Sequence, residues 1–306
     1  MEVAAAEVLL KRSINVHKFR YVSVLSDGDC KTYSHLQKLA VYGPDISIAK
    51  EECLNHIAKR LKTGLKNIVS EWRVKGRKPG NLKEETITKL ANYYRSAITK
   101  NTPNVQQMKS AVFATLYHCM STDETPQHFK CPFSEESWCF YNRALAAGEE
   151  PPKHDRSTMK TTLSPHVVSK IMPVYQRLAS DEILGCCTVG KTQNPNESLH
   201  SAIWTKCPKE VFVSKKKLEI AVTSGISEFN MGSEITQKLK AEVTGVELSA
   251  SGQKLGAMRD KRRLANSEVS GQRVFKTARR RLKLSKTAAE AKKKAAEGPT
   301  YGAGEY

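Results

Sequence analysis

The sequence lacks any long apolar run. No stretch approaches the ~18 consecutive apolar residues that a membrane-spanning helix requires. The amino terminus begins with an acid and several alanines, so it also lacks the basic start and apolar core of a secretory signal. We therefore expect a soluble protein in a reducing compartment, with its eight cysteines free or bound to metal rather than paired in disulfides.

Acidic residues are scarce relative to basic ones. The chain has 50 Lys or Arg and 31 Asp or Glu, which gives a net charge of +19 at pH 7. Residues 251–306 contain 15 of the basic residues and 5 of the acids, so about half of the excess lies there. A surface of this charge favours contacts with phosphates, and DNA is the expected partner.

Basic clusters in this last segment indicate either a nuclear import signal or an arm that contacts nucleic acid, and hence a nuclear protein. A solvated charged helix with neither role is the alternative. We expect residues 236–306 to form a basic, largely disordered tail. The clustered residues are Lys261, Arg262, Arg263, Arg279, Arg280, Arg281 and Lys283.

One acidic pair follows a predicted strand. Residues 19–26 are rich in β-branched and aromatic side chains and end at Asp27-Gly28-Asp29. Ligands bind at the carboxyl ends of strands in open α/β sheets, so a carboxylate there can hold a hard divalent cation such as Mg²⁺ or Mn²⁺. The alternative is that the acids form a turn or cap a helix over 30–39.

Another acid lies far downstream. Pro195 suits the first turn of a helix in which Leu199 and Ile203 repeat at helical spacing, and Glu197 then lies in that first turn. As an isolated observation, Glu197 is an ordinary first-turn acid favoured by the helix dipole. Its combination with Asp27 indicates a metal-dependent site.

The remaining pattern is mainly helical. We expect a short strand at 46–48, a basic loop at 73–81 and a linker at 148–164. Apolar spacing predicts helices at 3–16, 52–72, 82–116 with an interruption at 101–104, 167–180 and 215–231. No internal repeat is apparent.

Cysteines and histidines gather between residues 117 and 139. Soft thiolates and imidazoles held close together suit tetrahedral zinc, which would fix a segment poor in apolar side chains. The predicted ligands are His118, His128, Cys131 and Cys139, with Cys119 as the alternative to His118. The competing interpretation is buried cysteines with incidental histidines.

Cys53 and His56 are spaced i and i+3 at the start of a predicted helix, so their side chains share one face. No four ligands are visible nearby. We therefore expect a structural role, or support of the acidic site, rather than a separate metal.

Three separated segments resemble Mutator-like DDE transposases, in particular the animal branch. They are Ser26 to Asp29, Glu51 to Leu61 with its Cys-x-x-His, and Thr192 to Ser198, which reads Thr-Gln-Asn-Pro-Asn-Glu-Ser. The resemblance covers roughly residues 1–235. It implies an RNase H-like fold with a helical insertion before the final acid. By it, Asp27 is the second catalytic carboxylate, with Asp29 as its fallback, and Glu197 is the third.

The resemblance implies a mostly helical α/β chain in four parts. Residues 1–72 form a partial RNase H-like core, and 73–181 form a helical insertion with a zinc loop at 117–139. Residues 182–235 return to the core, and 236–306 are the tail. In this scheme Asn194, Asn196 and Ser198 orient Glu197 or contact phosphates.

The family's first acid lies on an early strand, in an Asp-Gly-Thr-Trp-like stretch that this chain does not contain. We therefore expect an amino-terminally truncated transposase, a domesticated remnant or an incomplete gene model, with a weak or dead two-metal site. The competing hypothesis is a non-catalytic nucleic-acid-binding protein. Without the early strands, the remaining strands have exposed edges, which need either the missing segment or a second copy of the chain as a neighbour.

Overall fold

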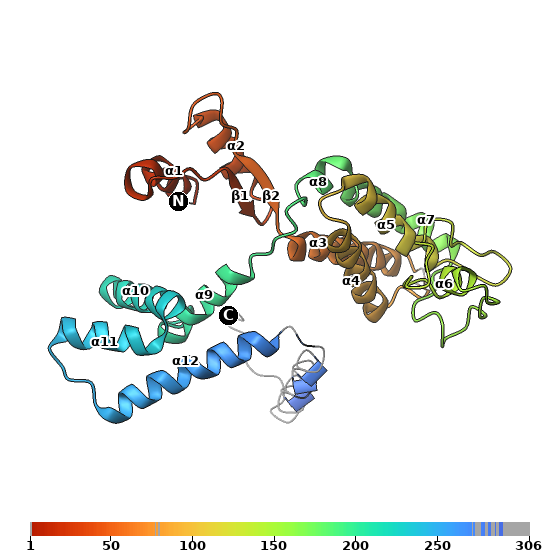
Figure 1. The fold of residues 1–306 in the computed structure, drawn as a ribbon. Helices are drawn as coiled ribbons and strands as arrows, with labels where there is room; N and C mark the ends of the chain where they lie inside the picture. The colour runs from red at the N-terminus through yellow and green to blue at the C-terminus, as the bar shows by residue number, and fades with distance from the viewer. Residues whose placement is uncertain are drawn as a thin grey trace. The chain divides into compact units, whose positions relative to one another are not determined.

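The structure is a computed structural model that describes residues 2–76, 78, 80–270, 272, 277–278, 281–282, 285 and 288–289. The chain divides into two compact units, Met1–Asn194 and Pro195–Tyr306 (Figure 1). Each unit is described by itself below. No described helix combines the length and the apolar composition needed to cross a membrane.

The first unit contains a small parallel sheet. Strands β1 (Ser23–Ser26) and β2 (Ala49–Glu52) pair in a register that places Ser26 beside Glu52. Helix α2 (Cys30–Leu39) connects them, which makes a β-α-β unit. Because parallel strands end at the same edge, Asp27 and Cys53 leave the sheet side by side.

The second strand lies later than expected. The sequence predicts a strand at 46–48 and a helix from 52, whereas β2 covers Ala49–Glu52 and the helix begins at Leu54. Ala, Lys and Glu have low β-propensity, so the local sequence does not indicate this strand. Pairing with β1 overrides the propensity, beginning with the hydrogen bond from the Ala49 N–H to the Val22 carbonyl at 2.8 Å.

Helix α1 (Glu2–Arg12) and a short π-helical turn, η1 (Ser13–His17), precede the sheet. A small core joins α1, α2 and the segment before β2 through Leu10, Leu36 and Ile48. The side chain of Gln37 on α2 also donates to the Ile48 carbonyl at 2.6 Å. This arrangement connects α2 to the segment that leads into β2.

A helical body forms the rest of the first unit. Helix α3 (Leu54–Val74) packs on α4 (Glu84–Asn101) and α7 (Pro165–Leu178), and α5 (Val105–His118) packs on α4 and α8 (Asp181–Gly185). The fully buried side chains of Leu61, Leu90 and Met108 belong to this core. The Tyr94 hydroxyl, also buried, donates to the Leu178 carbonyl at 2.7 Å. The apolar spacing therefore correctly predicts α3, α4, α5 and α7 and the break between α4 and α5, but not the short helix α8.

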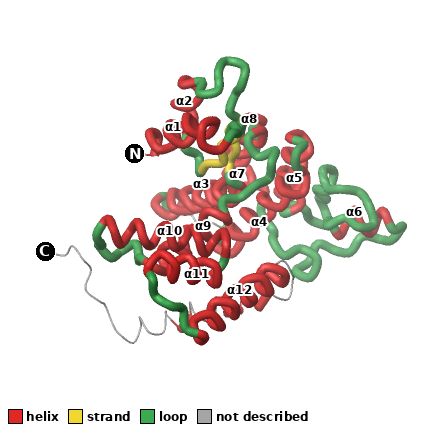
Figure 2. The backbone as a smooth tube through the Cα atoms, turned by 60° about the vertical axis from the view of Figure 1, so that its left-hand side comes forward, coloured by secondary structure: helices red, strands yellow, loops and turns green. Residues whose placement is uncertain are grey.

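Long loops flank the short helix α6 (Phe140–Ala146), and Figure 2 shows them in green. One covers residues 119–139 and the other residues 147–164. Few apolar side chains hold these loops, although the Leu163 N–H donates to the Cys119 carbonyl at 2.7 Å.

The second unit is helical where it is described. Its helices are α9 (Asn194–Lys206), α10 (Lys215–Met231), α11 (Ser233–Thr244) and α12 (Ala250–Ser270). The Asp260 carboxylate on α12 accepts hydrogen bonds from the Ser233 and Glu234 N–H groups of α11, at 2.7 and 2.9 Å. This contact satisfies orphan N–H groups at the start of α11.

The described part of the chain is mostly helical with one small parallel sheet, as the α/β prediction requires. The structure differs from the expected disordered tail at 236–306, because α11 and α12 extend to Ser270. A polar composition suggests disorder, but the long-range contact of Asp260 with α11 does not appear in composition.

Candidate functional site

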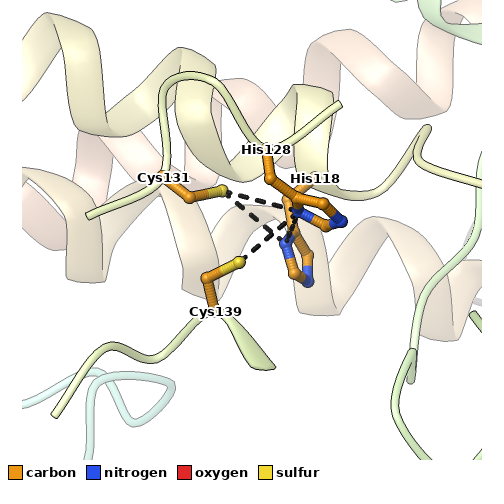
Figure 3. A group of neighbouring side chains, drawn as sticks. All are labelled: His118, His128, Cys131 and Cys139. Atoms are coloured by element: carbon orange, nitrogen blue, oxygen red, sulfur yellow. Dashed lines mark hydrogen bonds between the residues drawn. The ribbon is translucent and has the colours of Figure 1, made fainter. Parts of the chain in front are cut away.

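His118, His128, Cys131 and Cys139 converge on one point (Figure 3). Their ligand atoms all lie within 4.8 Å of one another, and His128, Cys131 and Cys139 are buried. Helix α5 ends at His118, a tight turn holds His128 and Cys131, and Cys139 is the N-cap of α6. The predicted zinc ligands are therefore brought together, with His118 rather than the alternative Cys119.

The spacing of these donors fits a tetrahedral ion. Zinc binds sulfur at about 2.3 Å and nitrogen at about 2.0–2.1 Å, so a tetrahedron places two nitrogens about 3.3 Å apart and nitrogen and sulfur about 3.6 Å apart. The two histidine Nδ1 atoms are 3.2 Å apart, and the sulfur to nitrogen distances are 3.4, 3.7 and 3.9 Å. The group can therefore hold a metal such as zinc.

Asn142 fixes the cysteines through its side chain and its backbone N–H. The Asn142 side chain donates to the carbonyls of His128 and Cys131, and the Asn142 N–H donates to the Cys139 sulfur at 3.5 Å. One buried amide thus connects the turn that holds two ligands with the helix that begins at a third.

Cys131 and Cys139 shift each other's pKa in opposite directions. The Cys131 thiol donates toward the Cys139 sulfur, which lowers the pKa of Cys139 and raises the pKa of Cys131, and contacts with His118 and His128 also favour the Cys139 thiolate. Burial raises the pKa of Cys119 to about 12, so this cysteine stays a thiol in the helical core. A thiolate is the form that a metal binds.

A third histidine, His154, supports the group from outside. His154 Nε2 lies 2.8 Å from His128 Nε2, and His154 Nδ1 lies 2.7 Å from the Asp123 carboxylate. Ser121 Oγ lies 2.9 Å from both Nε2 atoms. When His128 Nδ1 faces a metal, its Nε2–H donates to His154, whose Nδ1–H donates to Asp123.

The sequence does not reveal this role of His154, because the residue lies in a segment predicted as a linker. The only available signal is a further histidine close in the chain to the His/Cys segment. Hydrogen bonds from the backbone and ring of His154 lower the pKa of Asp123. The carboxylate is therefore ionised at neutral pH and can accept the proton of the ring.

Asp27 directly follows β1 and contacts the Cys-x-x-His segment. Its Oδ1 lies 2.6 Å from His56 Nδ1, and 55% of the Asp27 side chain is exposed. Since an ionised carboxylate only accepts, the His56 ring donates through Nδ1 and leaves the second carboxylate oxygen available. His56 is therefore in position to orient Asp27.

A groove of about 570 Å³ opens beside this carboxylate. Asp27 is the one acidic residue among its described lining residues, which include the cations Lys59, Arg60 and Arg177. Glu52 at the end of β2 is buried and pairs with Arg60 at 2.9 Å. The groove therefore presents a carboxylate among positive charges.

The downstream Thr-Gln-Asn segment returns to this edge of the sheet. The Gln193 N–H donates to the buried Cys53 sulfur at 3.4 Å, and the Gln193 side chain donates to the Leu25 carbonyl at 3.3 Å. Asn55 donates to the Asn194 side-chain oxygen at 3.0 Å. Cys53 and Asn194 thus join two of the sequence segments that the resemblance rests on.

The other sequence-predicted residues lie elsewhere. Asp29 caps α2, where its Oδ1 accepts from the Lys31 and Thr32 N–H groups, and these bonds, chiefly those from Thr32, lower its pKa. The helix-cap alternative is therefore what the structure shows for Asp29. Asn196, Glu197 and Ser198 are exposed in the first turn of α9, in the second unit.

The basic residues Lys261, Arg262 and Arg263 are exposed on α12, where Arg263 donates to the Glu228 and Phe229 carbonyls. Arg281 is described and its side chain is exposed. Arg279, Arg280 and Lys283 lie outside the described residues.

Part of the chain matches a model of a known protein family. No curated protein and no solved structure matches the chain. The matched family model is described as Mutator-like transposase and covers residues 1–139, which include the β-α-β unit, Asp27, His56 and all four metal-binding candidates. Over these 139 residues the chain is similar to the Mutator-like transposases.

Proposed function

We propose that this chain is a transposase-derived DNA-binding protein whose carboxylate site for strand cleavage is incomplete. One observation carries the proposal: His56 holds the Asp27 carboxylate at the carboxyl edge of two parallel strands, in a groove with Lys59, Arg60 and Arg177. Cations in such a groove suit the phosphates of a nucleic acid.

The similarity over residues 1–139 supports the origin of the chain in a transposase. The order of the three sequence segments supports the finer assignment to the animal branch, with Asp27 and Glu197 as the second and third catalytic acids of an RNase H-like core. Asn196 and Ser198 flank Glu197 in the first turn of α9 and suit an orienting role there.

Two-metal strand cleavage needs several carboxylates that bridge Mg²⁺ or Mn²⁺ ions, which stabilise the attacking and leaving oxygens. Among the described residues up to 194, the groove offers only Asp27, and this residue is already bonded to His56. This set does not fit two ions. We therefore assign DNA binding, and no cleavage step, to the groove.

We further propose that zinc in the His118 group has a structural role. The loops around α6 have few apolar side chains, and four ligands from three places in the chain would fix them to the end of α5. The four donors leave no ligand position for water or substrate, as is typical of structural zinc.

The test is incubation of supercoiled DNA with the full chain, with and without Mg²⁺ or Mn²⁺, beside the double variant Asp27→Ala, Glu197→Ala. We expect metal-independent binding measured by gel shift, and no nicking. Metal-dependent nicking that the double variant loses would show that the two acids suffice, and would refute the incomplete site. Absence of DNA binding would refute the function itself.

A second candidate is a non-catalytic nucleic-acid-binding protein of the nucleus, because the cations Lys261, Arg262 and Arg263 are consecutive and all exposed on α12. A fluorescent fusion should enter the nucleus, and Gln at these three positions should reduce its entry.

A second copy of the chain is a further expected partner, since β1 has β2 as its one neighbour among the described residues and Val22 beside it is exposed. Analytical ultracentrifugation of the full chain measures whether it forms a dimer.

A further inference from the structure

A second cavity, of about 530 Å³, lies next to the metal-binding group. It is lined by α4, α5, the start of α6 and the loop at 152–161, and His118 forms part of its wall. Its volume is within the ~300–1,000 Å³ of typical ligand sites. Neither the Asp27 groove nor the structural role of zinc uses this space.

Apart from His118 and Cys119, the ionisable side chains that line the cavity are all basic. Lys100 comes from the last turn of α4, Arg143 from α6 and Lys160 from the loop, and none of the described lining residues is Asp or Glu. All three basic residues are exposed. Their heads can therefore meet a ligand, and that ligand should be an anion.

The wall beside these cations is aromatic. The Trp138 ring packs edge-on against the His118 ring, with centroids 5.0 Å apart at 69°, and the Phe140 ring also packs edge-on against His118, at 5.7 Å. Trp138 nevertheless keeps 44% of its surface exposed while lining the cavity. A metal bound to His118 would fix the position of this indole, which then offers a rigid surface for a planar group.

Polar groups complete the cavity. Ser96, Asn101 and Thr158 line it and offer donors and acceptors of the kind that bind the edge of a heterocycle. The cavity thus combines a stacking surface, hydrogen-bonding groups and three cations. This combination matches a nucleotide, which is a planar heterocycle joined to a phosphate.

We propose that the cavity binds one unpaired nucleotide, with its base stacked on Trp138 and its phosphate held by Lys100, Arg143 and Lys160. The inference rests on the proposed function in one respect, because it takes the nucleotide from a DNA strand. A free mononucleotide offers the same chemistry, and the experiment separates these two sources.

The probe is a DNA duplex with a single bulged 2-aminopurine, compared with the same duplex fully paired and with free dAMP. Stacking on Trp138 should quench the 2-aminopurine fluorescence of the bulged duplex, which should bind more tightly than the paired one. Competition by dAMP at a similar concentration would identify a free nucleotide as the ligand, and bulged DNA binding without such competition would identify a DNA strand.

Trp138→Ala should weaken binding of the bulged duplex by about 5- to 150-fold, the range for loss of one stacked base, and leave the paired duplex unaffected. Trp138→Phe should retain most of the binding. Lys100→Gln should weaken both bulged DNA and dAMP. Zinc content and circular dichroism establish that each variant is folded.

The matched control is Phe129→Ala with Lys130→Gln. Phe129 is 68% exposed, Lys130 lies 5.7 Å from its ring centre, and neither lines the cavity. This aromatic and cationic pair should contribute no preference for the bulge.

Two outcomes would overturn the cavity proposal, provided that paired DNA still binds. One is that Trp138→Ala binds the bulged duplex as tightly as wild type, and the other is that the control variant loses as much affinity as Trp138→Ala. Failure of the wild-type chain to bind any duplex would instead refute the DNA-binding function, and binding of free dAMP would then support the cavity with a free nucleotide.

Discussion

Replacement of His154 by alanine should weaken metal binding although His154 is not one of the four ligands. In the wild-type chain, His128 Nε2, His154 and the Asp123 carboxylate form a continuous hydrogen-bonded series with distances of 2.8 and 2.7 Å. Alanine removes the acceptor of the His128 Nε2–H and frees the ring to rotate. The donor that faces the metal, Nδ1, then loses its fixed direction.

The magnitude follows from the place of His154 in this series. Loss of a hydrogen-bonding partner behind a metal ligand reduces metal affinity about 10- to 100-fold, which is about 1.4–2.7 kcal/mol. Ser121 Oγ also lies 2.9 Å from His128 Nε2, so it can accept in place of His154 and should keep the loss toward the lower end. Removal of a ligand, as in Cys139→Ser, should have a far larger effect.

The assay is competition for Zn²⁺ between the full chain and a chromophoric chelator at constant pH. The matched control is His166→Ala, which removes an exposed histidine that stacks on Trp72 at 6.2 Å in the helical body. Wild-type zinc affinity in His154→Ala, with helix content unchanged, would refute the reasoning. An equal loss in His166→Ala would show a general effect of destabilisation instead.

Three further predictions concern the core, the groove and the metal. Leu61→Ala, at a fully buried position, should lower the free energy of unfolding by about 2–5 kcal/mol in a urea titration, whereas Val74→Ala, at a position 89% exposed, should change it by less than about 0.5 kcal/mol. Lys59→Gln and Arg177→Gln should each reduce the slope of log affinity for DNA against log salt by about 1, and an unchanged slope would exclude contact of these side chains with phosphates. Removal of zinc by a chelator should speed hydrogen exchange at 119–164 while α3 and α4 stay protected; uniform exchange would contradict a local role of the metal.

Local patterns predicted α3, α4, α5 and α7 and the metal-binding group well, for a common physical reason. The apolar spacing of α3, α4, α5 and α7 directly reports the face that each buries, and Asn104 and Ser164 cap α5 and α7 as their residue types favour. His128, Cys131 and Cys139 lie within twelve residues, so a single loop brings them together.

Features that depend on distant partners were not predictable in this way. β2 consists of residues with low strand propensity and exists because β1 pairs with it. His154 contacts His128 across 26 positions of the chain, and Asp260 caps α11 across 27. That Asp27 and Glu197 belong to one metal site remains a prediction from the resemblance. In the structure, the contact partner of Asp27 is His56.

The helical body begins and ends at neighbouring points of the sheet edge. The Glu52 N–H donates to the Cys186 carbonyl at 2.7 Å, and the Leu54 N–H donates to the Lys191 carbonyl at 3.4 Å, so the chain leaves the sheet and returns to it at almost one place. Segments with adjacent ends are the ones that proteins gain and exchange most readily. An ancestral gene could therefore have acquired or replaced α3 to α8 in one recombination event, without any change in the threading of the strands.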